Sequence, residues 1–528
     1  MTETGAELLA DILDSYGFKR VFGNPGTTEL PMIDAFSESD IDFTLGMHED
    51  IAVGMASGYA MKKQDMNNSN PVSFVNLHTT PGLLHGSGNI YNAKRNNAPV
   101  IITTGSQSNT HEDRNPSLSG SRKSSIQDQV KWAREVSSAD ELPSVFRKAY
   151  RRSVSPPSGP VYLDIPMNVQ NQLTDQEPVQ VGEIQTSEHP SNVDSFQSLV
   201  SDDDEVVIFV GDAVRIEGNS SVEEVVRLSE YLDADVYGEI LMSRTCFDFS
   251  HPNWKGGLKH KSSPQTVCDE ADVVIEIGCI SNTPLVEMDF APYKCDSCVI
   301  TQSLDSASKN GHADLTYVGS IEHICQQIND VMTLRHPQDS ESNTTDIDGS
   351  LSVPVSYESF NNSLTTCLND SSNLFEEGVT VGSDLRPSIN SNFNFYSTKG
   401  GGLGYGMPGS VGVQLAEQDY RQESNYTISL IGDGSLQYYP QTLYSANQYI
   451  ESSLTFLVPN NNGYEILKDD ERKDETYLNF DGNLNVTGIA DNYGVASEVF
   501  ESGSLVDDIN KHVSQEEPTL LEVPVIKE

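Results

Sequence analysis

Two apolar runs near the end of the chain each stop at a cluster of polar residues. The first is Thr427–Ile431 and the second is Leu454–Val458, and each has the length and composition of a buried parallel strand. Residues Gln441–Tyr449 leave room for a crossover helix between them. Because the carboxyl ends of adjacent parallel strands meet at one edge of a sheet, we expect Gly432–Ser435 and Pro459–Gly463 to lie side by side.

Short apolar runs separated by helical stretches extend over the rest of the chain. Examples are Val72–Leu77, Val100–Thr104 and Val161–Ile165 in the first third, and Glu205–Val210 and Ala271–Gly278 in the middle. Strands that alternate with helices are typical of a parallel sheet covered on both faces. The sequence therefore predicts an α/β protein.

Two segments of different composition divide the chain. Asn171–Asp194 is rich in Gln, Glu, Thr and Pro, and His336–Pro354 is dense in Asp, Ser, Asn and Thr, so both are interpreted as linkers. A chain of 528 residues has room for three domains of ordinary size. We predict three doubly wound parallel-sheet domains, over residues 1–175, 195–335 and 355–528.

The two polar clusters near the end of the chain have the chemistry of a magnesium and diphosphate site. Mg²⁺ prefers oxygen ligands in octahedral geometry and is usually shared between protein and phosphates. Asp433, the amide of Asn461 and a backbone carbonyl near Gly463 can supply three such ligands. Gly432 and Gly434 allow backbone amides to approach an anion closely. A lone Gly-Asp-Gly is usually only a turn, so the prediction depends on the spacing of the two clusters.

A carboxylate in the N-terminal third also stands at a strand end. Glu49 follows the strand-like run that starts at Ile41, and the stretch Ala52–Ala60 after it is rich in small residues, which suits a closely packed helix. Strand-to-helix junctions are where α/β proteins place their chemistry. Taken alone, one of 78 acidic residues would be interpreted as a solvated surface charge.

Several segments resemble the thiamine-diphosphate-dependent enzymes, most closely their benzoylformate decarboxylase branch. "VFGNPGTTELPMIDAF" is similar to the first substrate and cofactor loop of that branch, and "HEDIAVGMASGYA" to the segment with the activating glutamate. Other similar segments are "FVNLHTTPGLLHGSGNIYNAKRNNAPVIITTGSQ", "PSGPVYLDIPMNVQ", "SRTCFDFSHPNWKGG" and "KGGGLGYGMPGSVGVQLAE". By this resemblance the three domains would be pyrimidine-binding, central and diphosphate-binding.

The resemblance implies thiamine diphosphate and Mg²⁺ as cofactors. A glutamate matching Glu49 hydrogen-bonds the pyrimidine ring in the family, and an apolar residue matching Leu403 props the cofactor into a bent conformation. The implied cofactor-binding residues are Asn24, Pro25, Gly26, Glu49, Gly402, Leu403, Gly432, Asp433, Gly434, Ser435, Asn461 and Tyr464, with Asp433, Asn461 and Gly463 as magnesium ligands. Some related synthases also hold FAD in the central domain. The turn Val210–Ala213 lacks the glycine-rich dinucleotide pattern, which argues only weakly against FAD here.

The implied catalytic residues are Glu49, His78 and Thr27. His78 follows the run Val72–Leu77 and could orient the carboxylate of a 2-oxo acid or move protons near neutral pH. Thr27 matches a substrate-contacting serine of the benzoylformate branch. Gln107, in the turn after the next strand-like run, is a candidate contact to substrate or cofactor.

The chain departs from the family pattern where the final proton donor is expected. Cys279–Val286 lacks the second histidine of benzoylformate decarboxylases, and Leu467 stands where pyruvate-type decarboxylases carry a glutamate. Three cations also stand in the polar loop between residues 106 and 125. A polar or anionic 2-oxo acid would explain them, and ion pairs with surface acids are the competing explanation. These cations are Arg114, Arg122 and Lys123.

The function that these features favour is non-oxidative decarboxylation of a 2-oxo acid to an aldehyde and carbon dioxide. An acetolactate-synthase-like ligase that joins two 2-oxo acids passes through the same intermediate, so it stays open as an alternative. A non-catalytic cofactor-binding homologue is a third interpretation. The presence of Glu49 argues against it.

The net charge is strongly negative, because 32 Lys and Arg stand against 78 Asp and Glu, a formal charge of −46. Nucleic acid and anionic membrane would be repelled, so neither is an expected partner. The acidic residues are spread along the chain, as in salt-adapted proteins, where screening removes most long-range repulsion. We expect the protein to lose structure at low salt.

The remaining expectations concern cysteines, location and assembly. Seven scattered cysteines do not suggest a disulfide framework, and the pair Cys295 and Cys298 lacks neighbouring histidines for a zinc site. No leader and no apolar run of ~20 residues is evident, so we expect a cytoplasmic protein. By resemblance, the active sites lie between subunits of a homodimer or homotetramer.

Overall fold

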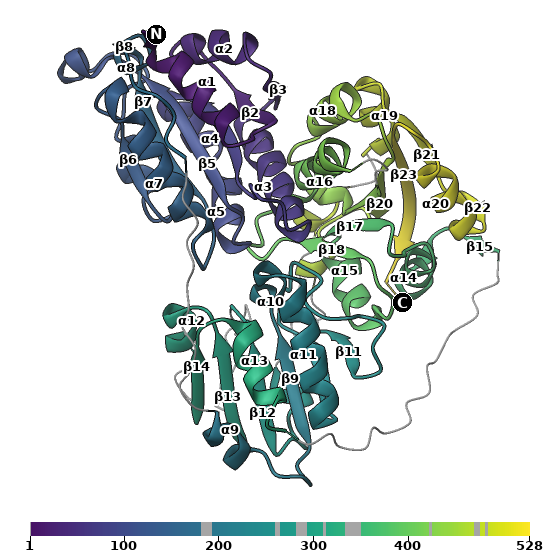
Figure 1. Ribbon diagram of the computed structural model, residues 1–528. Coiled ribbons are helices and arrows are strands. Elements are labelled where there is room, and N and C mark those ends of the chain that lie inside the picture. The colour runs from purple at the N-terminus through teal and green to yellow at the C-terminus, as the bar shows by residue number, and fades with distance from the viewer. Residues whose placement is uncertain are drawn as a thin grey trace.

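The computed structural model describes most of the chain (Figure 1). The described residues are 2–180, 193–258, 264–280, 293–309, 313–332, 350–421, 425–468, 476–480 and 484–527. Within them, no helix is both long and apolar enough to cross a membrane. About half of the first expected linker and most of the second fall outside these residues, and the described part of each contains a short strand that pairs with a neighbouring domain.

The first domain is a six-stranded parallel sheet in the order β3-β2-β4-β5-β7-β6. Its strands are β2 (Arg20–Asn24), β3 (Asp42–Leu45), β4 (Ser73–His78), β5 (Val100–Ser106), β6 (Ala133–Glu135) and β7 (Val161–Pro166). Its helices are α1 (Gly5–Ser15), α2 (Leu30–Ser37), α3 (Glu49–Asp65), α4 (Thr79–His85), α5 (Ser87–Arg95), α6 (Arg122–Ile126), α7 (Leu142–Val154) and α8 (Met167–Gln170). The short strands β1 (Glu3–Thr4) and β8 (Leu173–Thr174) pair antiparallel beside it.

The central domain is a second six-stranded parallel sheet in the order β11-β10-β9-β12-β13-β14. Its strands are β9 (Val206–Val210), β10 (Asp235–Gly238), β11 (Trp254–Gly257), β12 (Val273–Ile277), β13 (Asp296–Thr301) and β14 (Leu315–Val318). Its helices are α9 (Asp194–Leu199), α10 (Asp212–Glu217), α11 (Asn219–Leu232), α12 (Leu304–Lys309) and α13 (Ile321–Asn329). All seven cysteines of the chain are free, including Cys295 and Cys298.

The third domain is a seven-stranded parallel sheet in the order β16-β23-β20-β19-β17-β18, with β21 beside β23. Its strands are β16 (Val355–Ser356), β17 (Ser372–Glu377), β18 (Asn394–Ser397), β19 (Tyr426–Ile431), β20 (Leu454–Asn460), β21 (Ala496–Val499) and β23 (Pro518–Ile526). Its helices are α14 (Tyr357–Thr366), α15 (Thr380–Leu385), α16 (Gly406–Tyr420), α17 (Asp433–Leu436), α18 (Thr442–Tyr449), α19 (Val486–Asn492) and α20 (Leu505–Val513). A separate antiparallel pair joins β15 (Leu351–Ser352) to β22 (Ser502–Gly503).

The predicted fold class is therefore confirmed: three α/β domains, each with its own parallel sheet. The strands predicted at Thr427–Ile431 and Leu454–Val458 correspond to β19 and β20, which are adjacent and parallel. The predicted crossover helix corresponds to α18. Buried aliphatic runs explain these matches, because β19 and β20 are covered on both faces.

The first and third domains meet along α3 and α16, which lie side by side in Figure 1. Small residues permit the contact. A methyl group on Gly58 would come within 2.0 Å of the Gly409 carbonyl oxygen, and one on Gly412 within 1.9 Å of the Met55 carbonyl oxygen. The small-residue stretch after Glu49 is thus a helix packed backbone to backbone, as predicted.

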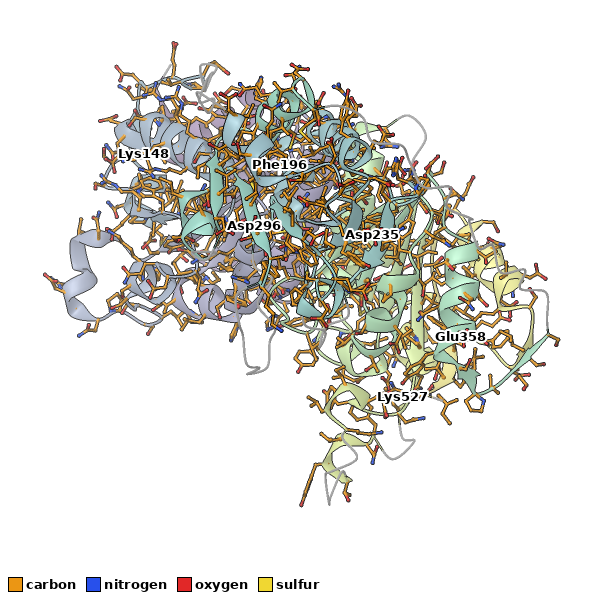
Figure 2. All side chains as sticks on the ribbon, turned by 90° about the horizontal axis from the view of Figure 1, so that it is seen from below. Lys148, Phe196, Asp235, Asp296, Glu358 and Lys527 are labelled. Atoms are coloured by element: carbon orange, nitrogen blue, oxygen red, sulfur yellow. The ribbon has the colours of Figure 1, made fainter. Side chains whose placement is uncertain are left out.

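The central domain joins the third through a buried cluster of charges. Lys399 donates to Asp212 at 2.9 Å and also contacts Glu239, and all three side chains are buried. Asp212 and Glu239 lie within two residues of the carboxyl ends of β9 and β10, the edge where doubly wound sheets usually bind nucleotides. Here a lysine of the third domain occupies that edge. Acidic side chains lie on the surface of the central and third domains, as Asp235, Asp296 and Glu358 illustrate (Figure 2).

Candidate active site

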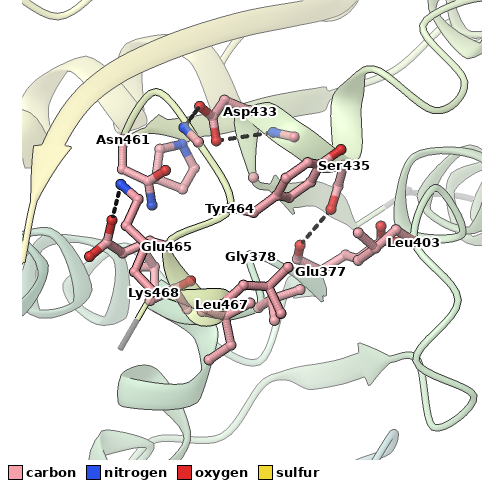
Figure 3. Close-up of a pocket in the computed structure, with 18 of the residues that line it drawn as sticks. Glu377, Gly378, Leu403, Asp433, Ser435, Asn461, Tyr464, Glu465, Leu467 and Lys468 are labelled. Carbon is pink, nitrogen blue, oxygen red and sulfur yellow. Dashed lines mark hydrogen bonds and ion pairs between the residues drawn. The ribbon is translucent and has the colours of Figure 1, made fainter. Parts of the chain in front are cut away.

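A cavity of about 400 Å³ opens at the carboxyl ends of β17, β19 and β20 (Figure 3). The described residues that line it lie between Glu377 and Lys468, so all belong to the third domain. They include most of the residues predicted to bind the diphosphate and the metal. The lining members of that set are Leu403, Gly432, Asp433, Gly434, Ser435, Asn461, Gly463 and Tyr464.

Asp433 connects the two polar loops that the sequence predicted to be neighbours. It is the first residue of α17 and is 2% exposed. Its carboxylate accepts the N–H of Gly434 at 3.0 Å and the N–H of Gly463 at 3.1 Å. Burial raises the pKa of Asp433 to about 6, and these hydrogen bonds act in the opposite direction.

Asn461 presents an acceptor that the protein leaves unused. Its amide nitrogen donates to the Tyr357 hydroxyl at 2.9 Å. Its Oδ1 is buried and has no hydrogen-bond partner among the described residues. A buried unpaired carbonyl oxygen is costly unless something binds it. Because Asn461 and the Asp433 carboxylate line the same cavity, the pair fits a hard cation such as Mg²⁺.

Leu403 lies in a loop held by a buried carboxylate. Gly401 and Gly404 have φ values of 69° and 88°, which favour glycine. Glu377, the last residue of β17, accepts the N–H groups of Gly404, at 2.6 Å, and of Gly406. Burial raises the pKa of Glu377 to about 7. Glu377 was not predicted from the sequence. Its one local sign is that two adjacent acidic residues, Glu376 and Glu377, end a buried strand.

Tyr464 covers the Gly432–Ser435 loop. A methyl group on Gly434 would come within 2.7 Å of the Tyr464 ring, so only glycine fits there without a shift. The ring packs edge-on against Phe480 at 5.1 Å between centroids. Glu465 and Leu467, which form one turn of 3₁₀ helix, both line the cavity, and Glu465 pairs with Lys468 at 2.6 Å.

The first-domain residues form a second group at the carboxyl edge of their own sheet. Glu49 starts α3, its side chain is 13% exposed, and its carboxylate lies 3.2 Å from Nδ1 of His85. Asn24 donates to the Gly46 carbonyl at 2.8 Å, Gly26 packs against the His78 ring, and Thr27 is exposed. None of these is among the described residues lining the third-domain cavity.

Gly402 contacts the first domain. Its N–H donates to Oδ1 of Asn92, a residue of α5, at 3.3 Å, and its carbonyl accepts the amide of Asn92 at 3.1 Å. The loop with Leu403 is therefore fixed to the first domain as well.

One cation of the polar loop between residues 106 and 125 forms an ion pair within the first domain. Arg122 is 4% exposed and donates from Nε to the buried carboxylate of Asp164 at 2.7 Å. Gln107 donates to the Ser117 carbonyl at 2.7 Å, while Arg114 and Lys123 are exposed. Arg122 is thus held in an ion pair, although its partner is a buried acid and not one of the surface acids that were expected. Most of Cys279–Val286, the segment that lacks the second histidine of benzoylformate decarboxylases, lies outside the described residues.

Comparisons with known proteins cover nearly the whole chain. Benzoylformate decarboxylase of Pseudomonas aeruginosa is 27% identical over 533 residues, with 97% of each chain covered. A probable acetolactate synthase large subunit of Methanocaldococcus jannaschii is 25% identical over 560 residues, which covers 99% of this chain and 92% of the relative.

Solved structures share the fold. A putative thiamin diphosphate-dependent enzyme from Mycobacterium smegmatis superimposes with a TM-score of 0.86 at 24% identity, with both chains fully covered. Benzoylformate decarboxylase from Polynucleobacter necessarius gives 0.85 at 24% identity, over 100% of this chain and 99% of that one.

Three models of one enzyme family match in order along the chain. They are described as the thiamine pyrophosphate enzyme N-terminal TPP binding domain, at residues 3–132, the central domain, at 193–328, and the C-terminal TPP binding domain, at 380–523. The first and last of these matches contain Glu49 and Asp433, respectively. The chain thus belongs to the thiamine-pyrophosphate-dependent enzymes.

Proposed function

We propose that the protein is a thiamine-diphosphate- and magnesium-dependent decarboxylase that converts a 2-oxo acid to an aldehyde and carbon dioxide. The observation that supports it best is the donor set of the third-domain cavity. There the buried Asp433 carboxylate and the unpaired Asn461 oxygen line one space with Leu403. Benzoylformate decarboxylase of P. aeruginosa, similar over 97% of both chains, supports the choice of reaction.

Each residue of the third-domain cavity has a proposed task. Asp433, Asn461 and the Gly463 carbonyl would hold Mg²⁺, and Gly432, Gly434 and Ser435 would contact the diphosphate. Leu403 would pack against the cofactor and favour its bent conformation. When bound, thiamine diphosphate supplies a nucleophilic carbon and an electron sink for cleavage beside the substrate carbonyl.

The first-domain group would supply the proton chemistry. Glu49 would hold a hydrogen bond to the pyrimidine ring, and His78 would orient the substrate carboxylate or move a proton. Asn24, Pro25 and Gly26 would shape the cofactor loop, and Thr27 would contact substrate. None of them lines the described third-domain cavity of the same chain, which supports a site completed by a second subunit, in a homodimer or homotetramer.

An acetolactate-synthase-like ligase is the second candidate. The probable synthase subunit of M. jannaschii, similar over 99% of this chain, is the observation that favours it. Both reactions share the loss of carbon dioxide and differ in what captures the product carbanion. Product analysis separates them, because a decarboxylase releases an aldehyde and a ligase an acetohydroxy acid.

The test is carbon dioxide release from a panel of 2-oxo acids in molar salt with added thiamine diphosphate and Mg²⁺. Glu49→Gln should lower kcat by about 100-fold or more, because it keeps the side-chain shape and removes the carboxylate. Glu38→Gln, an exposed site at the end of α2, is the matched control and should keep wild-type activity. Full activity of Glu49→Gln would contradict the proposal.

A further inference from the structure

A buried carboxylate, Glu29, lies directly behind His78. Its side chain is 0% exposed, and its Oε2 lies 2.8 Å from Nδ1 of His78. The same oxygen accepts the N–H of Gly26 at 2.9 Å. The other oxygen accepts the Thr28 hydroxyl at 2.7 Å and the N–H of Thr79 at 3.3 Å. Each of the two carboxylate oxygens of Glu29 therefore has two hydrogen-bond partners.

These contacts determine which ring nitrogen of His78 carries the hydrogen. A carboxylate only accepts, so the contact with Glu29 requires the hydrogen on Nδ1 of His78. Nε2, on the other side of the ring, then stays available to accept or deliver a proton. The described residues offer Nε2 no hydrogen bond, and the His78 side chain is 20% exposed.

Two glycines make the space for this pair. A methyl group on Gly26 would lie 2.0 Å from Nδ1 of His78, and one on Gly105 would lie 2.6 Å from Oε1 of Glu29. Gly26 lies in the loop after β2 and Gly105 lies near the end of β5, so the carboxyl ends of two strands form the slot. Larger residues at either position would separate the carboxylate from the ring.

The backbone next to His78 is strained in the same place. Thr79 is a buried β-branched residue with a φ of 36°, a backbone region that such residues rarely adopt. Its N–H is one of the groups that Glu29 accepts. The carboxylate thus holds both the His78 ring and the strained peptide after it. Strain of this kind persists where the surroundings hold it, and it marks functional sites.

We propose that Glu29 is a positioning residue that holds His78 with its hydrogen on Nδ1 and presents Nε2 to the 2-oxo acid or to the product carbanion. The inference rests on the proposed decarboxylase function, in which His78 touches the substrate. Glu29 acts only through His78 and reaches no reacting atom itself. Such a dyad lets a single histidine, held in one tautomer, serve as acceptor or donor at a fixed place.

The first test reads the tautomer directly and needs no activity. Magic-angle-spinning NMR of the protein labelled with ¹⁵N-histidine reports which ring nitrogen carries the hydrogen. The His78 signals among the 11 histidines are assigned by their loss in His78→Gln. We expect hydrogen on Nδ1 in the wild type and a substantial Nε2–H population in Glu29→Gln. A wild-type ring with hydrogen on Nε2 would overturn the inference even if the protein proves to be a decarboxylase.

The second test is a double-mutant cycle in carbon dioxide release by the holoenzyme. Glu29→Gln should lower kcat about tenfold or more, and His78→Gln about 100-fold. In the His78→Gln background, Glu29→Gln should not lower kcat further, because Glu29 acts on the reaction only through the His78 ring, which is absent there. Equal losses in both backgrounds would show a purely structural role and overturn the inference. If no 2-oxo acid is turned over, the proposed function fails, and the NMR result still decides the role of Glu29.

Discussion

Asp433 is a carboxylate whose pKa burial raises to about 6, well above the usual 3.8. Between pH 4 and 6 the unfolded chain loses this proton before the folded one. The metal-free protein therefore loses stability as the pH rises through that window, by roughly 3 kcal/mol. A cation that binds the ionised carboxylate reverses this loss, so Mg²⁺ should stabilise the protein little below pH 6 and fully above it.

Thermal denaturation in molar salt, with and without Mg²⁺ across pH 5 to 8, checks this expectation. Asp433→Asn should remove the Mg²⁺-dependent rise in Tm at every pH and flatten the decline of the metal-free protein. A rise in Tm with Mg²⁺ that has the same size at pH 5 and pH 8, or that survives in Asp433→Asn, would show that the cation binds elsewhere.

Single residues differ in how far their sequence reveals them. Asp433 and Asn461 could be placed because each stands within three residues of the end of a strongly apolar run that predicts a strand. Glu29 and Glu377 could not, because a carboxylate in an acidic chain carries no local mark of burial. What distinguishes them is contact with segments remote in sequence, such as His78 for Glu29 and Gly404 for Glu377. The roles assigned to Glu49, His78 and Thr27 stay predictions.

At the scale of elements, α3 carries two adjacent buried lysines with different partners. Lys62 pairs with the buried Glu417 at 2.6 Å, whereas Lys63 donates to the Val72 carbonyl at 2.9 Å and packs against the rings of Phe18, Tyr59 and Tyr420. Burial lowers the pKa of Lys63 from 10.5 to about 7. Lys63→Met should therefore stabilise the protein, by roughly 2 kcal/mol at pH 6.

The pH dependence separates the two lysines. Below pH 7 Lys63 is charged in both folded and unfolded chains, so its burial cost is complete. Between pH 7 and 10.5 the folded chain loses the proton first, the wild type gains stability, and the advantage of Lys63→Met shrinks. Lys62→Met is the matched control and should destabilise, since it leaves Glu417 buried without Lys62. Denaturant unfolding from pH 6 to 9.5 measures both, and a Lys63→Met advantage that grows with pH would contradict the argument.

Elements were predictable where one periodicity dominated. β19, β20 and α18 follow from apolar runs and the space between them, and the small residues of α3 follow from its composition. The 3₁₀ turn at Glu465–Leu467 could not be predicted, because no local sequence pattern distinguishes a single helical turn from an irregular loop. Pairing of Leu173–Thr174 with Glu3–Thr4 is likewise invisible in sequence, since the partners lie far apart along the chain.

At the scale of the whole molecule, the two groups of site residues predict complementation between inactive chains. Glu49→Gln and Asp433→Asn should each be inactive alone. If every site combines the first domain of one chain with the third domain of another, mixed dimers contain one intact site of two and should have about half of wild-type activity. Co-expression with two affinity tags isolates the mixed dimers.

One control and one contradicting outcome complete this test. Each variant paired with itself under a second tag is the control and should stay inactive. Mixed dimers without activity would show that both residues serve a site within one chain. The salt requirement inferred from the charge of −46 also stays a prediction at this scale.

The segment that starts at Lys399 touches all three domains. Lys399 binds two carboxylates of the central domain, Gly402 is held by Asn92 of the first, and Gly404 by Glu377 of the third. A loop fixed at three places cannot shift unless one of the domains moves with it. The space beside Leu403 thus depends on how the domains are placed. The central domain contributes none of the described residues that line the cavity. A substitution there would still change the reaction rate, although it contacts no reacting group.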